Sequence, residues 1–410
     1  MKQKNHTGAS ASAGLRQLHP NVWVLTLTSF LTDISSEMIF NLLPLFLANV
    51  LGVRTAIIGL IDGVAETTAS LTKLYSGALS DKLGRRKGLA VLGYGLSSLV
   101  KPLLYFANAW GWVLGVRFAD RVGKGIRTAP RDALVAASVD EKRRGLAFGL
   151  HRAGDTAGAF IGLLIAAAIV WASQSGVTAL TRATFQRVVL ASVVPALLAV
   201  LVLALGAREV SAKGEQGEAP TLSLKGLDRR FLLFLVAVIL FTLGNSSDAF
   251  IILRGQERGL SVLQVMGMLL TFNAVYSILS GPLGVLSDRL GRRRLILFGW
   301  LAYGLVYLGF ALAKTGWQVW ALFGFYGIYY AATEGSARAL IADLVTSERR
   351  GTAYGLYHAA VGLTALPASL LAGVLWQGVG AWGGFGAAAP FYFGAAMAIL
   401  AGLLFWRGVR

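Results

Sequence analysis

Charged residues occur where the sequence otherwise predicts membrane-spanning helices. The stretch "VRFADRVGKGIRTAPRDAL" (116–134) directly follows the apolar run "AWGWVLG" and carries seven charges: Arg117, Asp120, Arg121, Lys124, Arg127, Arg131 and Asp132. A charge at mid-bilayer costs on the order of 3 kcal/mol by insertion scales, so such side chains must face partners or a cavity. The spacing therefore predicts a polar interior inside an apolar protein.

Acidic residues in other apolar segments supply candidate partners and candidate proton carriers. Asp33 and Glu37 share one helix face at i, i+4, and Asp62 and Glu66 repeat that spacing. Proton coupling needs a carboxyl group that titrates near neutral pH in a desolvated site, and these four residues are our candidates. The alternative is a static salt-bridge network with the cations of 116–134.

A further polar group lies in the apolar segment 145–172. His151 titrates in the range that proton transfer needs, although a lone histidine near a helix end is more often structural. Asp155 and, from 116–134, Arg117 complete the set of proton-coupling candidates. Arg152 is close enough to Asp155 in sequence for the two charges to neutralise each other.

The cations of 116–134 have two possible uses. On a helix, residues 117, 121 and 124 share a face, Asp120 is placed to pair with Lys124 or Arg117, and Pro130 can kink the helix. The excess positive charge then faces the protein's own acids or an anionic substrate, and internal neutralisation is the favoured reading. Six residues are our substrate-binding candidates, the last two chosen from the aromatic-rich second half: Arg121, Lys124, Arg127, Asp248, Tyr330 and Tyr357.

The composition is that of a membrane protein. Of 410 residues, 55% are hydrophobic and 14% charged, against about 25% charged in soluble domains. The net charge of +18 does not indicate nucleic-acid binding, because the cations lie mostly between apolar runs. Without cysteine, disulfides and thiolate metal sites are excluded. We expect no metal site, no cofactor and no enzyme activity, since no nucleophile–base motif, phosphate loop or HExxH is present.

The hydropathy pattern predicts an all-α fold with twelve transmembrane helices. A span needs about 20 mostly apolar residues, and the candidates are 21–50, 57–80, 88–108, 110–137, 145–172, 186–206, 232–254, 260–283, 294–313, 317–343, 350–375 and 385–406. Lys and Arg concentrate in the loops after every second span, which predicts that these loops and both termini are cytoplasmic. The organisation is a tail (1–20), a six-helix bundle (21–206), a linker (207–231) with a possible amphipathic surface helix at its end, a second bundle (232–406) and a tail (407–410).

The two bundles repeat each other in sequence. "GALSDKLGRRK" (77–87) recurs as "GVLSDRLGRRR" (284–294), and "RRGLAFGLH" (143–151) recurs as "RRGTAYGLY" (349–357). "ALVA" (133–136) recurs as "ALIA" (339–342), and "DISSEM" (33–38) has a weaker echo in "NSSDAF" (245–250). Related halves of this size are typical of secondary transporters, which bind substrate at the interface near mid-membrane.

The chain resembles the major facilitator superfamily of secondary transporters, in its bacterial form. The loop G-x-L-x-D-x-x-G-R-R-K matches that superfamily's first signature and occurs twice. The resemblance implies two pseudo-symmetric bundles that rock between two states, and a gate formed by the signature residues: Gly77, Asp81, Arg85, Arg86, Gly284, Asp288, Arg292 and Arg293. Arg117, Gly123 and Gly125 fit the second signature, whose arginine is linked to proton coupling in many relatives.

The resemblance also implies a partner set and a location. We expect a monomer in the bacterial inner membrane that binds a small polar or anionic solute, and proton coupling is part of that hypothesis. Efflux of drugs or amphiphiles is the alternative, weakened because the antiporter signature's Gly-Pro is Gly158-Ala159 here. Transport of a metal ion or siderophore, or a receptor role without flux, are further alternatives.

Overall fold

The structure is a computed structural model that describes residues 18–174, 177–210, 226–346 and 349–408. Within these ranges the chain is helical and contains no strand. The side chains of Asp81 and Asp288, the tail before residue 18 and most of the predicted linker lie outside the description, including the start of its predicted surface helix.

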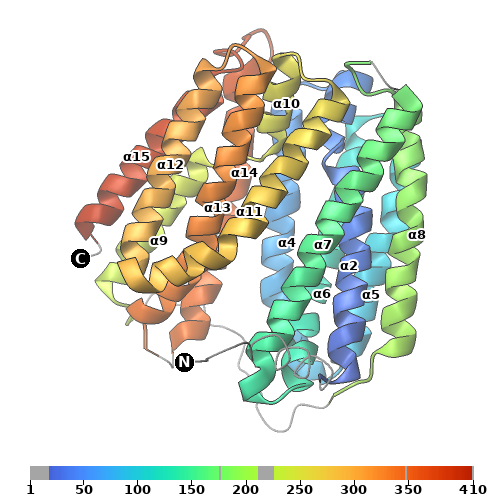
Figure 1. Ribbon diagram of the computed structural model, residues 1–410, viewed down its shortest axis with the longest axis vertical. Helices are drawn as coiled ribbons and strands as arrows, with labels where there is room; N and C mark the ends of the chain where they lie inside the picture. The colour runs from blue at the N-terminus through green and yellow to red at the C-terminus, as the bar shows by residue number, and fades with distance from the viewer. Residues whose placement is uncertain (1–17, 175–176, 211–225, 347–348, 409–410) are drawn as a thin grey trace, which may run out of the picture.

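Two groups of helices follow one another along the chain (Figure 1). The first half contains α2 (Pro20–Phe40), α3 (Leu43–Leu45), η1 (Phe46–Val50), α4 (Thr55–Leu83), α5 (Arg86–Val100), η2 (Lys101–Phe106), α6 (Trp110–Ala137), α7 (Glu141–Gln174) and α8 (Arg182–Gly206). The second half contains α9 (Arg229–Gly244), α10 (Ala249–Glu257), α11 (Val262–Leu290), α12 (Arg292–Leu312), α13 (Gly316–Leu344), α14 (Arg350–Gln377) and α15 (Ala389–Gly408). Each predicted span overlaps one helix or one run of consecutive helices.

Nine of the helical segments in the described ranges are long and apolar enough to cross a membrane. The helices α4, α6 and α13 are not among them, although they are 29, 28 and 29 residues long. Charged side chains occur inside all three, for example Asp62 and Glu66 in α4, Arg117 and Asp120 in α6, and Glu334 and Arg338 in α13. A total of twelve spans therefore remains a prediction, as does the side on which the termini lie.

The two ends of the bundle differ in which helix termini they contain. We call the end where α2 begins and α15 finishes the terminal end, and the opposite one, at α10, the far end (Figure 1). The turn between α4 and α5 lies at the terminal end, where Gly84 adopts φ +61° and stops α4 with a left-handed cap. Gly291 (φ +89°) takes the matching place between α11 and α12.

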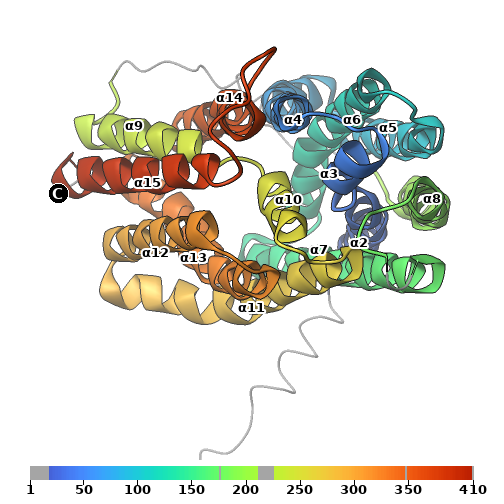
Figure 2. The ribbon, with the colours of Figure 1, turned by 90° about the horizontal axis from the view of Figure 1, so that it is seen from above.

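The two halves meet along two lines, α4 against α14 and α7 against α11 (Figure 2). Gly59, Gly63 and Gly373 allow the first contact: a Cβ on Gly59 would lie 2.0 Å from the carbonyl oxygen of Ser369, and one on Gly373 would lie 2.3 Å from that of Thr55. Thr55 Oγ1 donates to the carbonyl of Gly373 at 2.9 Å, and Thr67 Oγ1 donates to that of Gly362 at 2.6 Å. These contacts run from the far end to the middle of the bundle.

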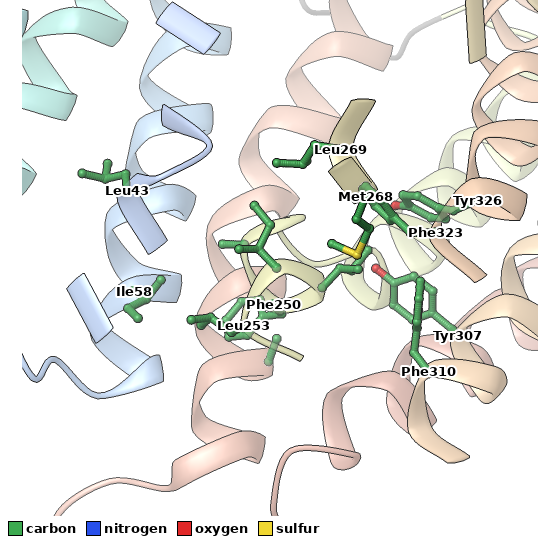
Figure 3. Close-up of a cluster of buried hydrophobic side chains, with 14 of the residues drawn as sticks. Leu43, Ile58, Phe250, Leu253, Met268, Leu269, Tyr307, Phe310, Phe323 and Tyr326 are labelled. Carbon is green, nitrogen blue, oxygen red and sulfur yellow. The ribbon is translucent and has the colours of Figure 1, made fainter. Parts of the chain in front are cut away.

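A continuous apolar cluster fills the far end and the second half (Figure 3). Leu43 and Ile58 of the first half belong to the same cluster as Phe250 and Leu253 of α10. Its second-half part is aromatic: the rings of Tyr303 and Tyr307 stack at 4.0 Å, and Tyr326 packs against both. This cluster seals the far end between the halves.

Candidate functional site

A cavity of about 360 Å³ lies between the halves at the middle of the bundle. Both halves line it, and most of its lining is polar. The side chains come from α2 and α3, α4, α6, the segment between α9 and α10, α10, α13 and α14: Asp33, Ser36, Glu37, Phe40, Asn41, Pro44, Asp62, Glu66, Arg117, Asp120, Arg121, Lys124, Arg127, Asn245, Ser246, Ser247, Asp248, Ala249, Ile252, Tyr330, Ala365 and Ser369.

Arginines of α6 are held by the protein's own carboxylates. Arg117 Nη2 lies 3.2 Å from Asp62 Oδ1, and Arg121 Nη1 lies 3.4 Å from Glu66 Oε1. The ring of Phe40 lies under both guanidinium groups, 4.1 Å from Cζ of Arg117 and 5.2 Å from that of Arg121. Cation–π contact and ion pairing together fix these two largely buried arginines at the cavity wall.

Asp120 has a different partner from the one expected on helical spacing. Its Oδ2 lies 3.6 Å from Nε of the adjacent residue, Arg121, and no ion pair joins it to Lys124 or Arg117 within the described residues. The expected partners are taken or directed elsewhere: Arg117 pairs with Asp62, and Lys124 is exposed in the cavity. Pro130 lies inside α6 without ending it.

The other two cations of α6 that line the cavity have no ion pair within 4 Å in the part of the chain described. Arg127 is buried with its Cζ 4.2 Å from the ring centre of Tyr94. Lys124 lines both the central cavity and the neighbouring one toward the terminal end. Of the substrate-binding candidates on α6, these two are therefore the ones that no carboxylate of the protein holds in an ion pair.

Acids of α2 face these cations from across the cavity. Asp33 lies within the electrostatic reach of Arg127 and Lys124 as well as of Asp155 and Glu37. Glu37 accepts a hydrogen bond from Nδ2 of Asn41 at 2.7 Å. Both acids line the cavity, as Asp62 and Glu66 do, so four predicted proton-coupling acids are brought together.

The second half contributes a break in its first helix. Between α9 and α10, residues 245–248 leave helical geometry, and Ser247 Oγ reaches across to donate to Asp62 Oδ2 at 2.8 Å. Asp248 accepts from the hydroxyl of Tyr326 at 3.3 Å. Asn245, Ser246 and Ser247 were not among the predicted site residues. The echo of "DISSEM" in "NSSDAF" was the available signal, since it places the segment opposite Asp33 and Ser36.

The two predicted tyrosines have different surroundings. Tyr330 lines the central cavity and packs edge-on against Tyr326, with ring centres 5.3 Å apart. Tyr357 does not line that cavity, because its ring lies parallel to that of Phe234 at 6.2 Å on the α9 side of α14.

Two further cavities continue from the central one toward the terminal end. One, of about 450 Å³, lies between α4, α6 and α14 and shares Glu66 and Lys124 with the central cavity. The other, of about 410 Å³, lies between α6, α7, α11 and α13 and shares Tyr330. The space between the halves is thus sealed at the far end and extends toward the terminal end.

The polar residues of α7 line the second of these cavities. His151 Nδ1 lies 3.5 Å from Asp155 Oδ2, so the two remaining proton-coupling candidates contact each other. Arg152 does not neutralise Asp155 by a direct ion pair. It reaches the other half, where Nη2 donates to the hydroxyl of Tyr276 at 2.6 Å and lies 3.3 Å from Glu334, because α7 presents it toward α11 and α13.

The predicted gate arginines lie at the two symmetry-related turns at the terminal end, and the other gate residues lie in the helices before these turns, α4 and α11. Arg86 and Arg292 are each the first residue of a helix, and each donates from Nη1 to a carbonyl of the "AL(V/I)A" repeat, Ala133 at 3.5 Å and Ala339 at 2.8 Å. The structure thus matches Arg86 to Arg292, one residue away from the pairing in the sequence repeat. Arg292 also pairs with Asp343, Arg293 donates to the carbonyl of Trp406, and Arg85 is exposed.

The signature glycines are not in close helix contact in this conformation. A Cβ on Gly284 would meet no atom within 4 Å, and one on Gly77 would meet the Cβ of Ala129 at an ordinary 3.5 Å. Each lines one of the cavities at the terminal end. Asp81 and Asp288 have no described side chain, so their predicted gate role stays a prediction.

Comparison with known proteins agrees with this architecture. The model of the Major Facilitator Superfamily matches residues 25–270 and 233–410. An uncharacterized MFS-type transporter of Methanocaldococcus jannaschii is 36% identical over 395 residues, covering 95% of each chain. The multidrug resistance protein MdtG of Serratia proteamaculans is 25% identical over 74% of each chain.

A solved structure shows the same fold. A bacterial homolog of the human lysosomal transporter Spinster, in an inward-facing and unoccupied conformation, superposes with a TM-score of 0.75 at 16% identity. The match covers 95% of this chain and 96% of that one.

Proposed function

The chain belongs to the Major Facilitator Superfamily, and we propose that it is a secondary transporter that moves a small polar solute across the membrane by alternating access. The observation that carries this proposal is the central polar cavity between two related halves. Its continuation toward the terminal end, with a sealed far end, supports one of the two states that alternating access requires.

Orientation and span number belong to the same proposal. Twelve spans place both termini on one side, and the concentration of Lys and Arg in the loops at the terminal end supports a cytoplasmic location for it. The conformation is then inward-facing in a bacterial inner membrane. The predicted gate residues of the two signature turns lie at this same end.

Proton coupling is supported by carboxylates that have no cation within 4 Å. Of the four predicted proton-coupling acids that line the cavity, Asp33 and Glu37 are in this position, whereas Asp62 and Glu66 are held by arginines of α6. A carboxylate that no cation holds can take up or release a proton without breaking an ion pair. Asp33 and Glu37 are therefore the stronger candidates of the four.

The test is transport in proteoliposomes with an imposed pH gradient. A thermal-shift screen of small metabolites at two pH values supplies the solute, and its flux is then followed with the gradient in either direction. We expect flux to depend on the gradient in the wild type and to lose that dependence in Asp33→Asn or Glu37→Gln. Glu141→Gln, which changes an exposed carboxylate at the start of α7, is the matched control. Flux that ignores the gradient would contradict the coupling.

Efflux of amphiphilic compounds is a second candidate, favoured by the similarity to MdtG along 74% of the chain. The aromatic surface beside Tyr330 is the feature of the site that supports it. Competition for transport by hydrophobic cations, together with transport that survives reversal of charge at Lys124, would favour this candidate over a polar solute.

A further inference from the structure

The central cavity has more negative than positive side chains in its lining. Six carboxylates face it against four cations: Asp33, Glu37, Asp62, Glu66, Asp120 and Asp248 against Arg117, Arg121, Lys124 and Arg127. Two of the four cations are already paired with internal acids. An anionic solute would therefore find few positive side chains in the lining that the protein's own acids do not already hold.

Asp248 is the cavity-lining acid whose surroundings best suit a positively charged ligand. Among the described residues, it is the only charged side chain that the second half contributes to the lining of this cavity. No Lys, Arg or His nitrogen lies within 4 Å of it in the part of the chain described, and its hydrogen-bond donor is the neutral hydroxyl of Tyr326 at 3.3 Å. A carboxylate in such a place is stable when it takes up a proton or binds a positive ligand.

A structural role as a helix cap does not account for Asp248. It occupies the N-cap position of α10, but its side chain makes no capping hydrogen bond. Ser247 Oγ performs that task instead, accepting from the amide of Ala249 at 3.1 Å. The carboxylate is left free to face the cavity and Tyr326.

The groups around Asp248 are those that bind an ammonium ion. The ring of Tyr330 lines the same cavity and offers a cation–π surface, and the side chains of Asn245 and Ser247 offer oxygen acceptors. The carboxyl-terminal end of α9, with its negative dipole, finishes at Gly244 directly before this segment. The site therefore combines a carboxylate, an aromatic face and oxygen acceptors.

We propose that the transported solute is a small organic amine whose ammonium group binds Asp248 against the ring of Tyr330. The proposal rests on the proposed transport function and names its substrate class. It replaces the anionic solute that the cations of α6 suggested, since Arg117 and Arg121 serve the protein's own acids.

Three probes of equal chain length and different end charges test this: putrescine, γ-aminobutyrate and succinate. Binding to the purified full-length protein is measured by isothermal titration calorimetry. We expect both amines to bind, with succinate weaker than putrescine by at least about 30-fold, the effect of about 2 kcal/mol from one desolvated charge pair. Binding by succinate alone, or by none of the three, overturns the proposal. This comparison uses the wild type and needs no variant to fold.

Variants at position 248 then assign the site. Asp248→Asn should weaken putrescine binding by about 30-fold or more, Asp248→Glu should retain most of it, and Asp140→Asn, at an exposed loop carboxylate, should leave it unchanged. Unchanged amine binding in a folded Asp248→Asn protein would overturn the assignment. Flux measurements separate this inference from the proposed function. Proton-coupled flux of a dicarboxylate would refute the amine as substrate and leave the transport function standing. Amine binding without flux would refute the transport function and leave the amine-binding site standing.

Discussion

At the scale of single residues, Asp62 is the carboxylate that links the two halves at the cavity. Its Oδ1 pairs with Arg117 of α6, and its Oδ2 accepts from Ser247 in the break of the other half. Both charged side chains are largely buried, with 14% of Asp62 and 6% of Arg117 exposed. Burial of this kind makes each partner depend on the other, because a lone buried charge is far less stable than a pair.

We predict strong coupling between these two residues in a double-mutant cycle. Asp62→Asn or Arg117→Gln alone should lower the free energy of unfolding by about 3–5 kcal/mol, because each leaves an unpaired buried charge. The double variant should recover part of this loss, which gives a coupling energy of about 1–3 kcal/mol. Reversible unfolding in mixed detergent micelles measures the four proteins.

The control for this cycle is the pair Arg144–Glu141 at the start of α7. Its nitrogen and oxygen lie 3.7 Å apart, and 49% and 86% of the two side chains are exposed. Glu141→Gln should change stability by less than about 1 kcal/mol. Additive effects of Asp62→Asn and Arg117→Gln would show that the two charges do not depend on each other.

At the scale of elements, glycines determine how closely α7 approaches α2. A Cβ on Gly158 would lie 2.4 Å from the carbonyl oxygen of Phe30, and one on Gly162 would lie 2.6 Å from that of Ile34. Backbone atoms cannot move aside as a flexible side chain can. The glycines of α7 are therefore used for close helix packing.

The prediction at this scale compares two glycines of α7. Gly158→Ala should destabilise the protein by about 1–3 kcal/mol through overpacking against α2. Gly149→Ala adds the same methyl group where no atom lies within 4 Å, and should be neutral or stabilising by up to about 1 kcal/mol. Thermal unfolding of both variants measures the contrast, and equal effects would contradict the packing argument.

Sequence patterns predicted the elements better than the contacts between them. The repeat and the apolar runs predicted two related helical halves. The i, i+4 spacing of the acids predicted shared helix faces, and Asp33, Glu37, Asp62 and Glu66 do line one cavity. Helical periodicity is a local property: the spacing along one helix decides which side chains share a face, whichever neighbours that helix has in the fold. The acidic and cationic faces of neighbouring helices then meet because neither can face lipid.

Contacts across the bundle could not be predicted in the same way. Phe40 lies under two guanidinium groups, and Arg152 reaches Glu334 in the other half rather than Asp155 on its own helix. Both outcomes depend on which helices become neighbours and on where each long side chain finds room. The helix break at residues 245–248 was not predicted either, because the weak repeat of "DISSEM" does not indicate a break. Ser247 in this break contacts Asp62 of the other half, which no local pattern shows.

At the scale of the whole molecule, one end is sealed and the other is not. Besides the apolar cluster, the far-end seal contains α4 packed on α14 through glycines, and Arg54 Nη1 donates to the carbonyl of Gly380 at 2.9 Å. Toward the terminal end, the same two helices diverge around a cavity of about 450 Å³. A two-state transporter must break the first contact to close the second space.

We therefore predict that Gly373→Val shifts the protein toward the opposite state, because its side chain would collide with the backbone of Thr55 and Ala56 only while the far end is closed. Overpacking of about 1–3 kcal/mol corresponds to a change of about 5–150-fold in the ratio of the two conformations.

The chain has no cysteine, so a single introduced thiol reports the accessibility of its position without background labelling. Labelling should slow at Tyr354→Cys, which lines the terminal-end cavity, and accelerate at Thr55→Cys, which is buried in the seal. Gly351→Ala in the same helix, with no atom within 4 Å of its Cβ, should change neither rate. If both rates rose together in Gly373→Val, the halves would be separating rather than exchanging states.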